Sequence, residues 1–308
     1  KITLTMKYVV TGGAGFIGSH IIEFLVERGD SVLVLDNFHT GKKSNLEKVI
    51  DKIEIVNVDI RDYEKLKKEI KDVDGIFHQA ALASVQESFT KKNEYLDVNV
   101  KGTENIFLIA QKLDLKVVYA SSSSVYGNPV SLPIKESDPK NPFNPYAETK
   151  LADDQIAEKL SKNGLKAIGL RYFNVFGERQ SKEYAGVVKL FLQKIQNKIP
   201  PKINGDGSQS RDFVFVEDVV KANIMSMESQ INHTFFNVGT GKNISVLELA
   251  NVMIKASCLD LEPIHGPALE GDVSATLADI THIKKSLDWN PTISIEEWLE
   301  KKISNLNN

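Results

Sequence analysis

The chain has 308 residues, and at about 150 residues per domain this length suggests two domains, or one large domain with an added lobe. Hydrophobic residues make up 42% and charged residues 26%, which are globular values and exclude a mainly disordered chain. The net charge of -3 leaves no positive excess to neutralise a phosphate backbone, so we expect no nucleic-acid partner.

Composition also argues against a metal site and a membrane span. The single cysteine, Cys258, can form no internal disulfide, and the six histidines include no close pair at metal-ligand spacing. The apolar runs fall far short of the roughly 20 residues that cross a bilayer. We therefore expect a cytoplasmic protein. Residues 1–5 lack an apolar signal region and precede Met6, so we interpret them as an expression leader.

Between Lys7 and Arg171, short β-branched runs alternate with longer segments of helical period, which is typical of repeated βα units. The pattern predicts strands at Tyr8–Thr11, Ser31–Asp36, Ile53–Asp59, Gly75–His78, Lys116–Ser121 and Lys166–Leu170. It predicts helices at Phe16–Arg28, Tyr63–Glu69, Asn93–Leu113 and Tyr146–Lys162. The predicted fold class is therefore α/β, with a Rossmann-type doubly wound parallel sheet in residues 6–171.

The regularity ends after Arg171, where short strands and helices alternate with loops. We expect residues 172–308 to form mainly a smaller C-terminal α/β lobe that binds substrate. Within this part, Asp212–Val216, Glu217–Met227 and Phe235–Val238 read as a strand, a helix and a strand. The first domain is therefore expected to recruit residues 212–238.

Two of the predicted helices, at residues 93–113 and 146–162, carry apolar residues outside a single stripe. Such a helix either lies deep inside one domain or covers a second face at a subunit interface. A homodimer formed through these two helices is therefore a hypothesis that the sequence leaves open beside deep burial.

The segment after the first predicted strand carries three glycines, Gly12, Gly15 and Gly18, ahead of a predicted helix. In such a loop the glycines allow a tight turn, close approach to a pyrophosphate and close packing of the helix, whose N-terminus attracts anions. Asp36 ends the next strand, where it can accept hydrogen bonds from ribose hydroxyls but would repel a 2'-phosphate. The pattern predicts dinucleotide binding, with NAD preferred over NADP.

The glycine spacing is GxxGxxG, and it occurs together with Asn99, the serine run Ser121–Ser124 and the segment Tyr146-Ala147-Glu148-Thr149-Lys150. In these features the chain resembles the extended short-chain dehydrogenase/reductases, and most of all the UDP-glucose 4-epimerase branch that includes UDP-N-acetylglucosamine 4-epimerases. The resemblance runs from Met6 to about Leu299. It implies an NAD-dependent isomerase of nucleotide-sugar and galactose metabolism that acts on UDP-glucose and UDP-galactose, and on their N-acetylated counterparts.

The same resemblance implies a set of residues that contact the cofactor. These residues are Gly12, Gly15, Phe16, Ile17, Gly18, Asp36, Asn37, Asp59, Ile60, Gln79, Ala80, Ala81, Asn99, Tyr146, Lys150 and Phe173. His78, at the end of a predicted strand, is interpreted as a packed histidine and is assigned no chemistry.

The candidate catalytic residues are Tyr146, Lys150 and Ser122. Tyr146 and Lys150 are four residues apart, so on a helix the ammonium can lie near the phenol. A phenol has an ordinary pKa of about 10, and a neighbouring cation lowers it toward neutrality, which makes Tyr146 a candidate base. The resemblance implies that Lys150 also holds the nicotinamide ribose and that Ser122 hydrogen-bonds the reacting hydroxyl.

The residues after Ser122 separate the reaction classes of the resembled families. Dehydratases carry Asp and Glu directly after the Ser or Thr, and sugar-acid decarboxylases carry Glu at the second place, whereas this chain has Ser123 and Ser124. The absence of a second carboxylate favours an epimerase. The alternatives are a lyase or 4-reductase on the same scaffold, a UDP-glucuronate 4-epimerase, whose relatives carry Thr at the position of Asn174, and a non-catalytic NAD-binding regulator.

The resemblance implies a second set of residues that bind the nucleotide sugar. These residues are Ser84, Ser122, Ser123, Tyr146, Asn174, Val188, Arg211, Asp272 and Thr276. Arg211 is expected to clamp the diphosphate, and the small Thr276 is expected to leave room for an N-acetyl group. Two positions depart from the family pattern, because Leu269 replaces a second diphosphate arginine and Asn204 replaces an aromatic residue that packs on the base.

Overall fold

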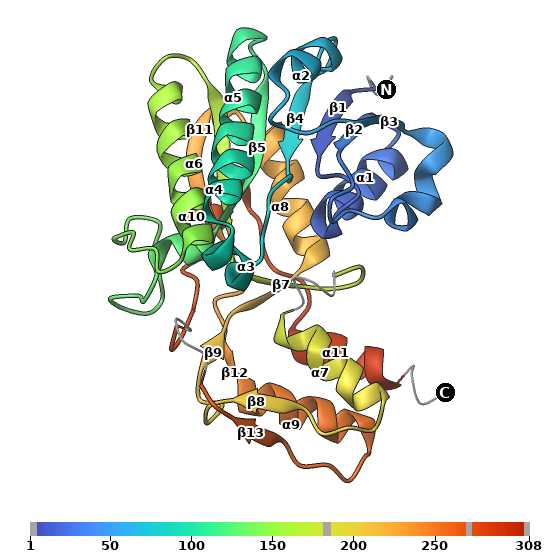
Figure 1. The fold of residues 1–308 in the computed structure, drawn as a ribbon, viewed down its shortest axis with the longest axis vertical. Helices are drawn as coiled ribbons and strands as arrows, with labels where there is room; N and C mark the ends of the chain where they lie inside the picture. Colours follow the sequence, from blue (N-terminus) through green and yellow to red (C-terminus); the bar gives the residue numbers. More distant parts are fainter. Residues whose placement is uncertain (1–4, 181–185, 269–272, 305–308) are drawn as a thin grey trace.

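The structure is a computed structural model that describes residues 5–180, 186–268 and 273–304 (Figure 1). Its centre is a sheet of seven parallel strands in the order β11-β6-β5-β4-β1-β2-β3. In chain order the strands are β1 (Lys7–Thr11), β2 (Ser31–Asp36), β3 (Glu54–Asn57), β4 (Gly75–His78), β5 (Lys116–Ser122), β6 (Lys166–Tyr172) and β11 (His233–Val238). This order confirms the predicted doubly wound parallel sheet.

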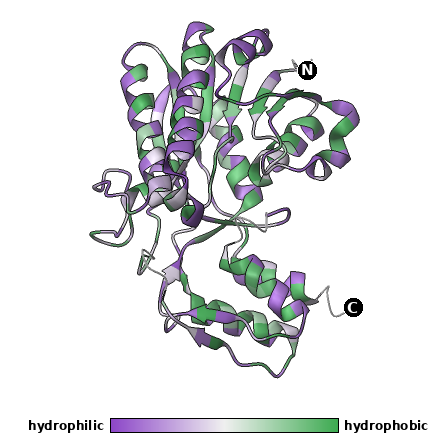
Figure 2. Cartoon of the chain, viewed as in Figure 1, coloured by the Kyte–Doolittle hydropathy of each residue, from purple (hydrophilic) through white to green (hydrophobic). Residues whose placement is uncertain are grey.

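Helices cover both faces of the large sheet, which explains why its strands read as continuous apolar runs. On β1, Tyr8 and Val10 pack into a core with residues of α1 (Phe16–Arg28) and α8 (Val216–Glu228). Val9 points to the opposite face, into a core shared with α2 (Tyr63–Glu69), α5 (Gly102–Lys112) and α6 (Pro145–Ser161). In Figure 2 hydrophobic residues run along these strands, whereas hydrophilic residues alternate with them on α5 and α6.

The helix predicted at residues 93–113 is interrupted in the structure. It consists of α4 (Lys92–Tyr95), a π-helical turn η2 (Leu96–Lys101) and α5. Such wide turns are frequent at functional sites because they displace one residue from the regular helical register. Asn99 lies in this turn and is fully buried.

Helix α6 begins where local sequence signals place a helix start. Asn144 caps it by accepting a hydrogen bond from the backbone N–H of Ala147 at 2.8 Å, and Pro145 occupies the first turn. The first two turns of α6 carry Tyr146 and Lys150, so the cap fixes where the tyrosine enters the site.

The strand order reverses between β1 and β4, which lie side by side with Thr11 opposite His78. Connections leave these two strands in opposite directions, which leaves a crevice at their carboxyl ends, the usual ligand position in such sheets. The crevice therefore lies at the glycine loop.

A smaller lobe lies below the sheet in the view of Figure 1. It packs α7 (Val187–Gln196), α9 (Val246–Ser257) and α11 (Ile295–Ser304) around its own apolar core. Its short strands pair as β8 (Lys202–Asn204) with β13 (Ile264–Gly266) and as β9 (Ser210–Arg211) with β12 (Ile244–Ser245). The remaining helical elements are η1 (Lys43–Lys52), α3 (Val85–Thr90), η3 (Ser123–Tyr126) and α10 (Thr281–Leu287).

The segment at residues 212–238 is divided between the two parts of the molecule. Strand β11 pairs with β6 in the large sheet, whereas β10 (Phe213–Phe215) pairs with β7 (Asn174–Phe176) outside it. The strand predicted at Asp212–Val216 therefore forms, but it connects the large sheet to the lobe instead of extending the sheet.

Within the described ranges, no helix combines the length and the apolar character needed to span a bilayer. The same residues hold no group of three or more His, Cys, Asp or Glu side chains that could bind a metal ion.

Candidate active site

The glycine loop joins β1 to α1 and approaches the end of β4 closely. Gly12 has φ +63°, and a Cβ atom there would lie 2.7 Å from the backbone N and Cα of Ala80. A Cβ atom on Gly18 would lie 2.4 Å from the carbonyl oxygen of Gly12. Only glycine fits both positions, so the loop stays thin where a ligand has to reach the strand ends.

The first turn of α1 offers free donors at this loop. Its N-cap is Gly15, which supplies no side-chain acceptor, and the turn contains no acidic residue. The positive end of the helix dipole and the uncapped backbone N–H groups therefore face the crevice, which suits a diphosphate.

Acidic side chains lie at the ends of β2 and β3. Asp36 is buried, and its carboxylate accepts hydrogen bonds from the backbone N–H of Ala14 at 2.9 Å and of Phe38 at 2.7 Å. Burial raises the pKa of Asp36, and these two hydrogen bonds oppose the rise. Asp59 behaves differently, because hydrogen bonds from Arg61 lower its pKa to about 2. Both groups retain lone pairs that can accept ribose hydroxyls.

A cavity of about 570 Å³ runs along these strand ends. Of the predicted cofactor residues, all but Asn99 line it. The glycine loop, Asp36, Asn37, Asp59 and the strand end Gln79-Ala80-Ala81 thus form one surface that also contains Tyr146, Lys150 and Phe173. The chemistry of this lining fits a dinucleotide: a thin loop, free N–H donors for phosphate and carboxylates for ribose.

Asn99 instead supports the wall of this cavity. Its side-chain oxygen accepts a hydrogen bond from the backbone N–H of Leu82 at 2.8 Å, and its amide donates to the Leu82 carbonyl at 2.9 Å. The amide also donates to the hydroxyl of Thr149 at 3.0 Å. These contacts hold residue 82 and α6 together, and a cofactor contact of Asn99 stays a prediction.

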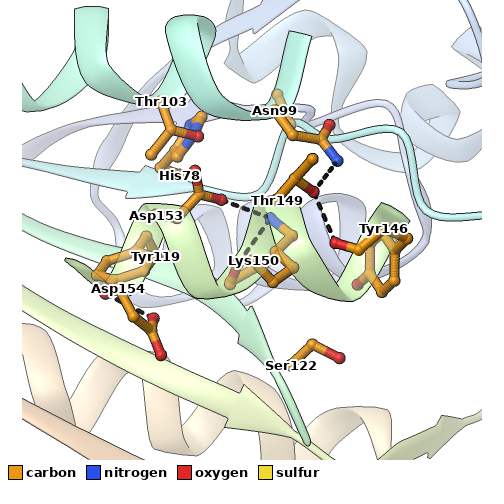
Figure 3. A network of polar contacts seen from close by, with 12 residues as sticks. His78, Asn99, Thr103, Tyr119, Ser122, Tyr146, Thr149, Lys150, Asp153 and Asp154 are labelled. Carbon is orange, nitrogen blue, oxygen red and sulfur yellow. Dashed lines mark hydrogen bonds and ion pairs between the residues drawn. The ribbon is translucent and has the colours of Figure 1, made fainter. Parts of the chain in front are cut away.

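Tyr146 and Lys150 lie on one side of α6 and both line the cavity (Figure 3). The Lys150 ammonium donates to the carbonyl oxygen of Ala120 at 3.0 Å and lies 3.3 Å from a carboxylate oxygen of Asp153. The lysine side chain is only 3% exposed, whereas Tyr146 is half-buried. Tyr146 can therefore contact a ligand, while the Lys150 ammonium is shielded from water.

Ser122 ends β5 across from Tyr146. Its hydroxyl oxygen accepts hydrogen bonds from the backbone N–H of Ser124 at 3.1 Å and from the Ser124 hydroxyl at 2.8 Å. Ser122 and Tyr146 both line the cofactor-sized cavity and a second cavity of about 340 Å³. The two cavities meet at this serine–tyrosine pair, which is where a reaction between two bound molecules could occur.

The second cavity is lined by most of the predicted substrate residues: Ser122, Ser123, Tyr146, Asn174, Arg211 and Thr276. Val188 lines the first cavity instead. Ser84 lines neither of the two, because its hydroxyl caps α3 by accepting from the backbone N–H of Glu87 at 3.2 Å. Asp272 and Leu269 lie outside the described residues, and Asn204 ends β8 in the lobe.

Several lining residues were missed by the sequence analysis. Val85, Gln86 and Phe89 come from α3, and Phe143 precedes α6. Phe89 and Phe143 are 52% and 41% exposed, which is unusual for large aromatic side chains in a folded protein. Phe143 adjoins the Asn144 cap, and this proximity to Tyr146 was the one local signal that could have pointed to it.

A buried ion pair supports the other side of α6. The Arg171 guanidinium on β6 donates to the Asp154 carboxylate at 2.9 Å and to the Tyr126 hydroxyl at 2.9 Å. Tyr119 on β5 donates to the other Asp154 oxygen at 2.9 Å. These contacts fix α6 against β5 and β6, so the angle at which Tyr146 enters the cavity is set by the sheet.

Comparison with known proteins gives consistent matches over most of the chain. The model of the NAD dependent epimerase/dehydratase family matches residues 8–239. A putative UDP-glucose 4-epimerase of Methanocaldococcus jannaschii is 40% identical over 305 residues, covering 97% of this chain and 98% of the relative. A UDP-N-acetyl-alpha-D-glucosaminuronate decarboxylase of Bacillus cytotoxicus is 31% identical over 310 residues, covering 96% of each chain.

A solved structure has the same architecture. The UDP-N-acetylglucosamine 4-epimerase of Methanobrevibacter ruminantium M1, in complex with UDP-N-acetylmuramic acid, superposes with a TM-score of 0.93 at 35% identity, covering 98% of each chain. The similarity thus includes the lobe as well as the large sheet.

Proposed function

The chain belongs to the NAD dependent epimerase/dehydratase family, and we propose that within this family it interconverts UDP-sugars that differ in configuration at C4. The cofactor is NAD. The free N–H donors at α1, the thin loop at Gly12 and the carboxylate of Asp36 are the residues that would hold it. NAD, when bound there, supplies the chemistry of taking the C4 hydrogen with its electron pair and returning it.

The proposal rests on one observation above all: the described lining of the second cavity contains no carboxylate, histidine or cysteine. Elimination of water from the sugar requires an acid and a base in addition to the tyrosine, and the families that carry it out resemble one another in placing Asp and Glu after the serine. Here Ser123 and Ser124 occupy those positions. Tyr172 also lines this cavity, but its buried hydroxyl is hydrogen-bonded to Gln79 and Asn223. Tyr146 is thus the candidate acid or base of this lining, which supports chemistry confined to C4.

Three residues of the protein carry out different parts of the proposed reaction at C4. Tyr146 removes the proton from the C4 hydroxyl while the carbon is oxidised, and it returns the proton after the 4-keto sugar has turned its other face to the cofactor. The nearby Lys150 ammonium stabilises the phenolate. The Ser122 hydroxyl hydrogen-bonds the sugar oxygen, which fixes its distance from the tyrosine.

We propose a neutral sugar as substrate. Arg211 is the one cation among the described residues of the second cavity, and its planar fork suits the diphosphate. A uronic acid would bring an additional carboxylate that meets no second cation in this lining. Thr276 lies at the cavity wall, and its small side chain supports acceptance of N-acetylated sugars beside glucose and galactose. The similarity to a decarboxylase makes the acidic sugars the main alternative.

The test is a panel of nucleotide sugars incubated with the purified protein without added cofactor, with products separated by chromatography. We expect UDP-glucose to equilibrate with UDP-galactose, and UDP-N-acetylglucosamine with UDP-N-acetylgalactosamine. The Tyr146→Phe variant, which keeps the ring, is the matched control and should lose this activity. Release of carbon dioxide from a uronic acid, a dehydrated sugar or stoichiometric consumption of NADH would contradict the proposal. Absence of any turnover would favour a cofactor-binding regulator.

We also propose a cytoplasmic homodimer built from two-domain subunits. Residues 93–112 and α6 lie next to each other on the same side of the sheet, where Leu96 is 40% exposed (Figure 1). An apolar side chain at this position would be covered if the same helices of a second chain packed against it. Sedimentation equilibrium tests the assembly, and a monomer at micromolar concentration would contradict it.

A further inference from the structure

The carboxylate of Asp153 lies next to the ammonium of Lys150, a residue of the proposed site. Asp153 follows Lys150 by three residues on α6, so both side chains project from the same part of the helix. One carboxylate oxygen of Asp153 lies 3.3 Å from the Lys150 ammonium nitrogen (Figure 3). The exposed fractions of the two side chains are 0% and 3%. The mechanism derived above makes no use of this carboxylate.

Among the groups that surround Asp153, the Lys150 ammonium is the cation that pairs with it. From α6 itself it faces Lys150 and the neighbouring Asp154, whose charge is taken up by Arg171 of β6. Tyr119 of β5 lies close enough for the charge of Asp153 to help raise the pKa of its phenol. From β4 and α5 come the His78 ring and the Thr103 hydroxyl.

His78 does not provide a second positive charge. Its two ring nitrogens contact the hydroxyls of Thr11 at 2.6 Å and Thr103 at 2.9 Å. Complete burial and the nearby Lys150 lower the pKa of His78 to about 3, so the ring is neutral at physiological pH. Lys150 is therefore the group that compensates the Asp153 carboxylate.

Packing alone does not account for a carboxylate at this position. Burial raises the pKa of Asp153 to about 7, although the adjacent ammonium and the Thr103 hydroxyl both favour its charged form. A buried charge of this kind is costly unless it is paired, and an apolar residue of similar size would avoid the cost. The carboxylate therefore points to a role that involves Lys150, the one cation beside it.

We propose that Asp153 is a positioning residue for the reaction, because its carboxylate orients the Lys150 ammonium and supplies its counter-charge at the cavity that Tyr146 and Lys150 both line. This inference rests on the proposed epimerase function. Two N–H groups of the ammonium are directed to the carbonyl oxygen of Ala120 and to the carboxylate of Asp153. An ammonium has three donors, so the third is left for the cavity side that Lys150 lines.

The decisive variant is Asp153→Asn, which keeps the size of the side chain and removes its charge. Without the carboxylate the buried ammonium loses its counter-charge, so it gives up its proton more readily as the pH rises. We expect kcat of the NAD-loaded enzyme to fall about tenfold at pH 8, and the alkaline fall of its pH profile to move about one pH unit lower. Loss of packing alone would lower kcat evenly at every pH and leave the profile in place.

Two controls on the same helix separate charge from burial. Asp154→Asn removes an equally buried carboxylate that pairs with Arg171, and Glu158→Gln removes an exposed charge. Neither control should shift the pH at which kcat falls on the alkaline side of the profile, which is its alkaline limb. An alkaline limb that stays in place in Asp153→Asn, or that moves equally in both controls, would overturn the proposal.

A double-mutant cycle with Lys150→Met tests the pair without any activity measurement. We expect the unfolding equilibrium constants of the two single variants and the double variant to be non-additive by at least about tenfold, since each single change leaves a buried charge alone. Additive effects would overturn the proposal even if Asp153→Asn were inactive. If no nucleotide sugar were epimerised by the unaltered protein, the proposed function would fail, while this cycle would still report whether the pair is coupled.

Discussion

The side-chain amide of Asn99 donates a hydrogen bond to the hydroxyl of Thr149 across 3.0 Å. This contact joins the π-helical turn of residues 96–101 to α6, one residue before Lys150 (Figure 3). Asn99 also pairs with both backbone groups of Leu82, which lines the larger cavity. One buried amide therefore holds the cavity wall and the helix of the proposed base in a fixed relation.

Replacing Asn99 by Leu should lower the free energy of unfolding and reduce the turnover rate of the proposed reaction. The change leaves the backbone N–H and C=O of Leu82 without partners in a buried position, and each such group costs about 1–3 kcal/mol. We expect a loss of about 3 kcal/mol in the free energy of unfolding, measured by urea denaturation. Thr149→Val, which removes one of the three contacts, should cost about 1 kcal/mol. A variant at Asn99 as stable as the unaltered protein would contradict this account.

The large sheet was predictable because its strands are short apolar runs between residues that break them. β2 at Ser31–Asp36 and β4 at Gly75–His78 have the predicted bounds. The π-helical turn within residues 93–113 was not predicted, because its apolar residues still recur at helical spacing and nothing local marks the wider turn. It is set by the buried contacts of Asn99, which involve residues 17 and 50 positions away in sequence.

The site was predictable where one segment carries several of its residues. The glycine loop and the Tyr146 to Lys150 segment line the cavity together, as the sequence indicated. Phe89 and Phe143 were not found, because they belong to segments whose meeting depends on how α3 packs against α6. Hydrophobic periodicity reports which face of an element is buried, but it does not report which loops meet at its end.

Gly12→Ala should abolish cofactor retention. The new methyl group would lie 2.7 Å from the Ala80 backbone at φ +63°, so the loop or the end of β4 must move. We expect NAD affinity to fall about 100-fold, or about 3 kcal/mol, and the purified protein to contain little NAD.

The chain offers a matched control for this change. Gly29 ends α1 at φ +96°, and a Cβ atom there would meet nothing within 4 Å. Gly29→Ala should cost about 1 kcal/mol of stability from backbone strain and leave the NAD content unchanged. Equal NAD loss in the two variants would show that strain, and not the close approach to Ala80, governs binding.

Thr276→Tyr should remove the N-acetylated sugars from the proposed substrate range. Thr276 lies in the wall of the second cavity, which has a volume of about 340 Å³, and a phenol ring there would occupy space that an N-acetyl group needs. We expect kcat/KM for UDP-N-acetylglucosamine to fall about 100-fold, with less than a threefold change for UDP-glucose, in parallel assays. Thr276→Ser should keep both activities. A parallel loss of both substrates in the tyrosine variant would place the N-acetyl group elsewhere.

The buried carboxylate of Asp153 predicts a pH dependence of stability. Its pKa is raised by burial from 3.8 to about 7 in the folded protein. Below pH 3.8 the side chain is protonated in both states, so its contribution to stability is fully present. Between pH 3.8 and 7 the unfolded chain releases this proton and the folded chain keeps it, so stability falls by about 1.4 kcal/mol per pH unit from this group.

Asp153→Asn isolates this contribution, because the amide does not titrate and all other groups are shared. The difference in unfolding free energy, unaltered protein minus variant, should fall by on the order of 3 kcal/mol between pH 4 and 7 and then level off. Urea denaturation at half-unit pH steps measures it. A flat difference would mean that the carboxylate is already ionised at pH 4, and that the Lys150 ammonium offsets the full cost of burying it. A difference that rises with pH would mean that the ammonium lowers the pKa of Asp153 below its ordinary value.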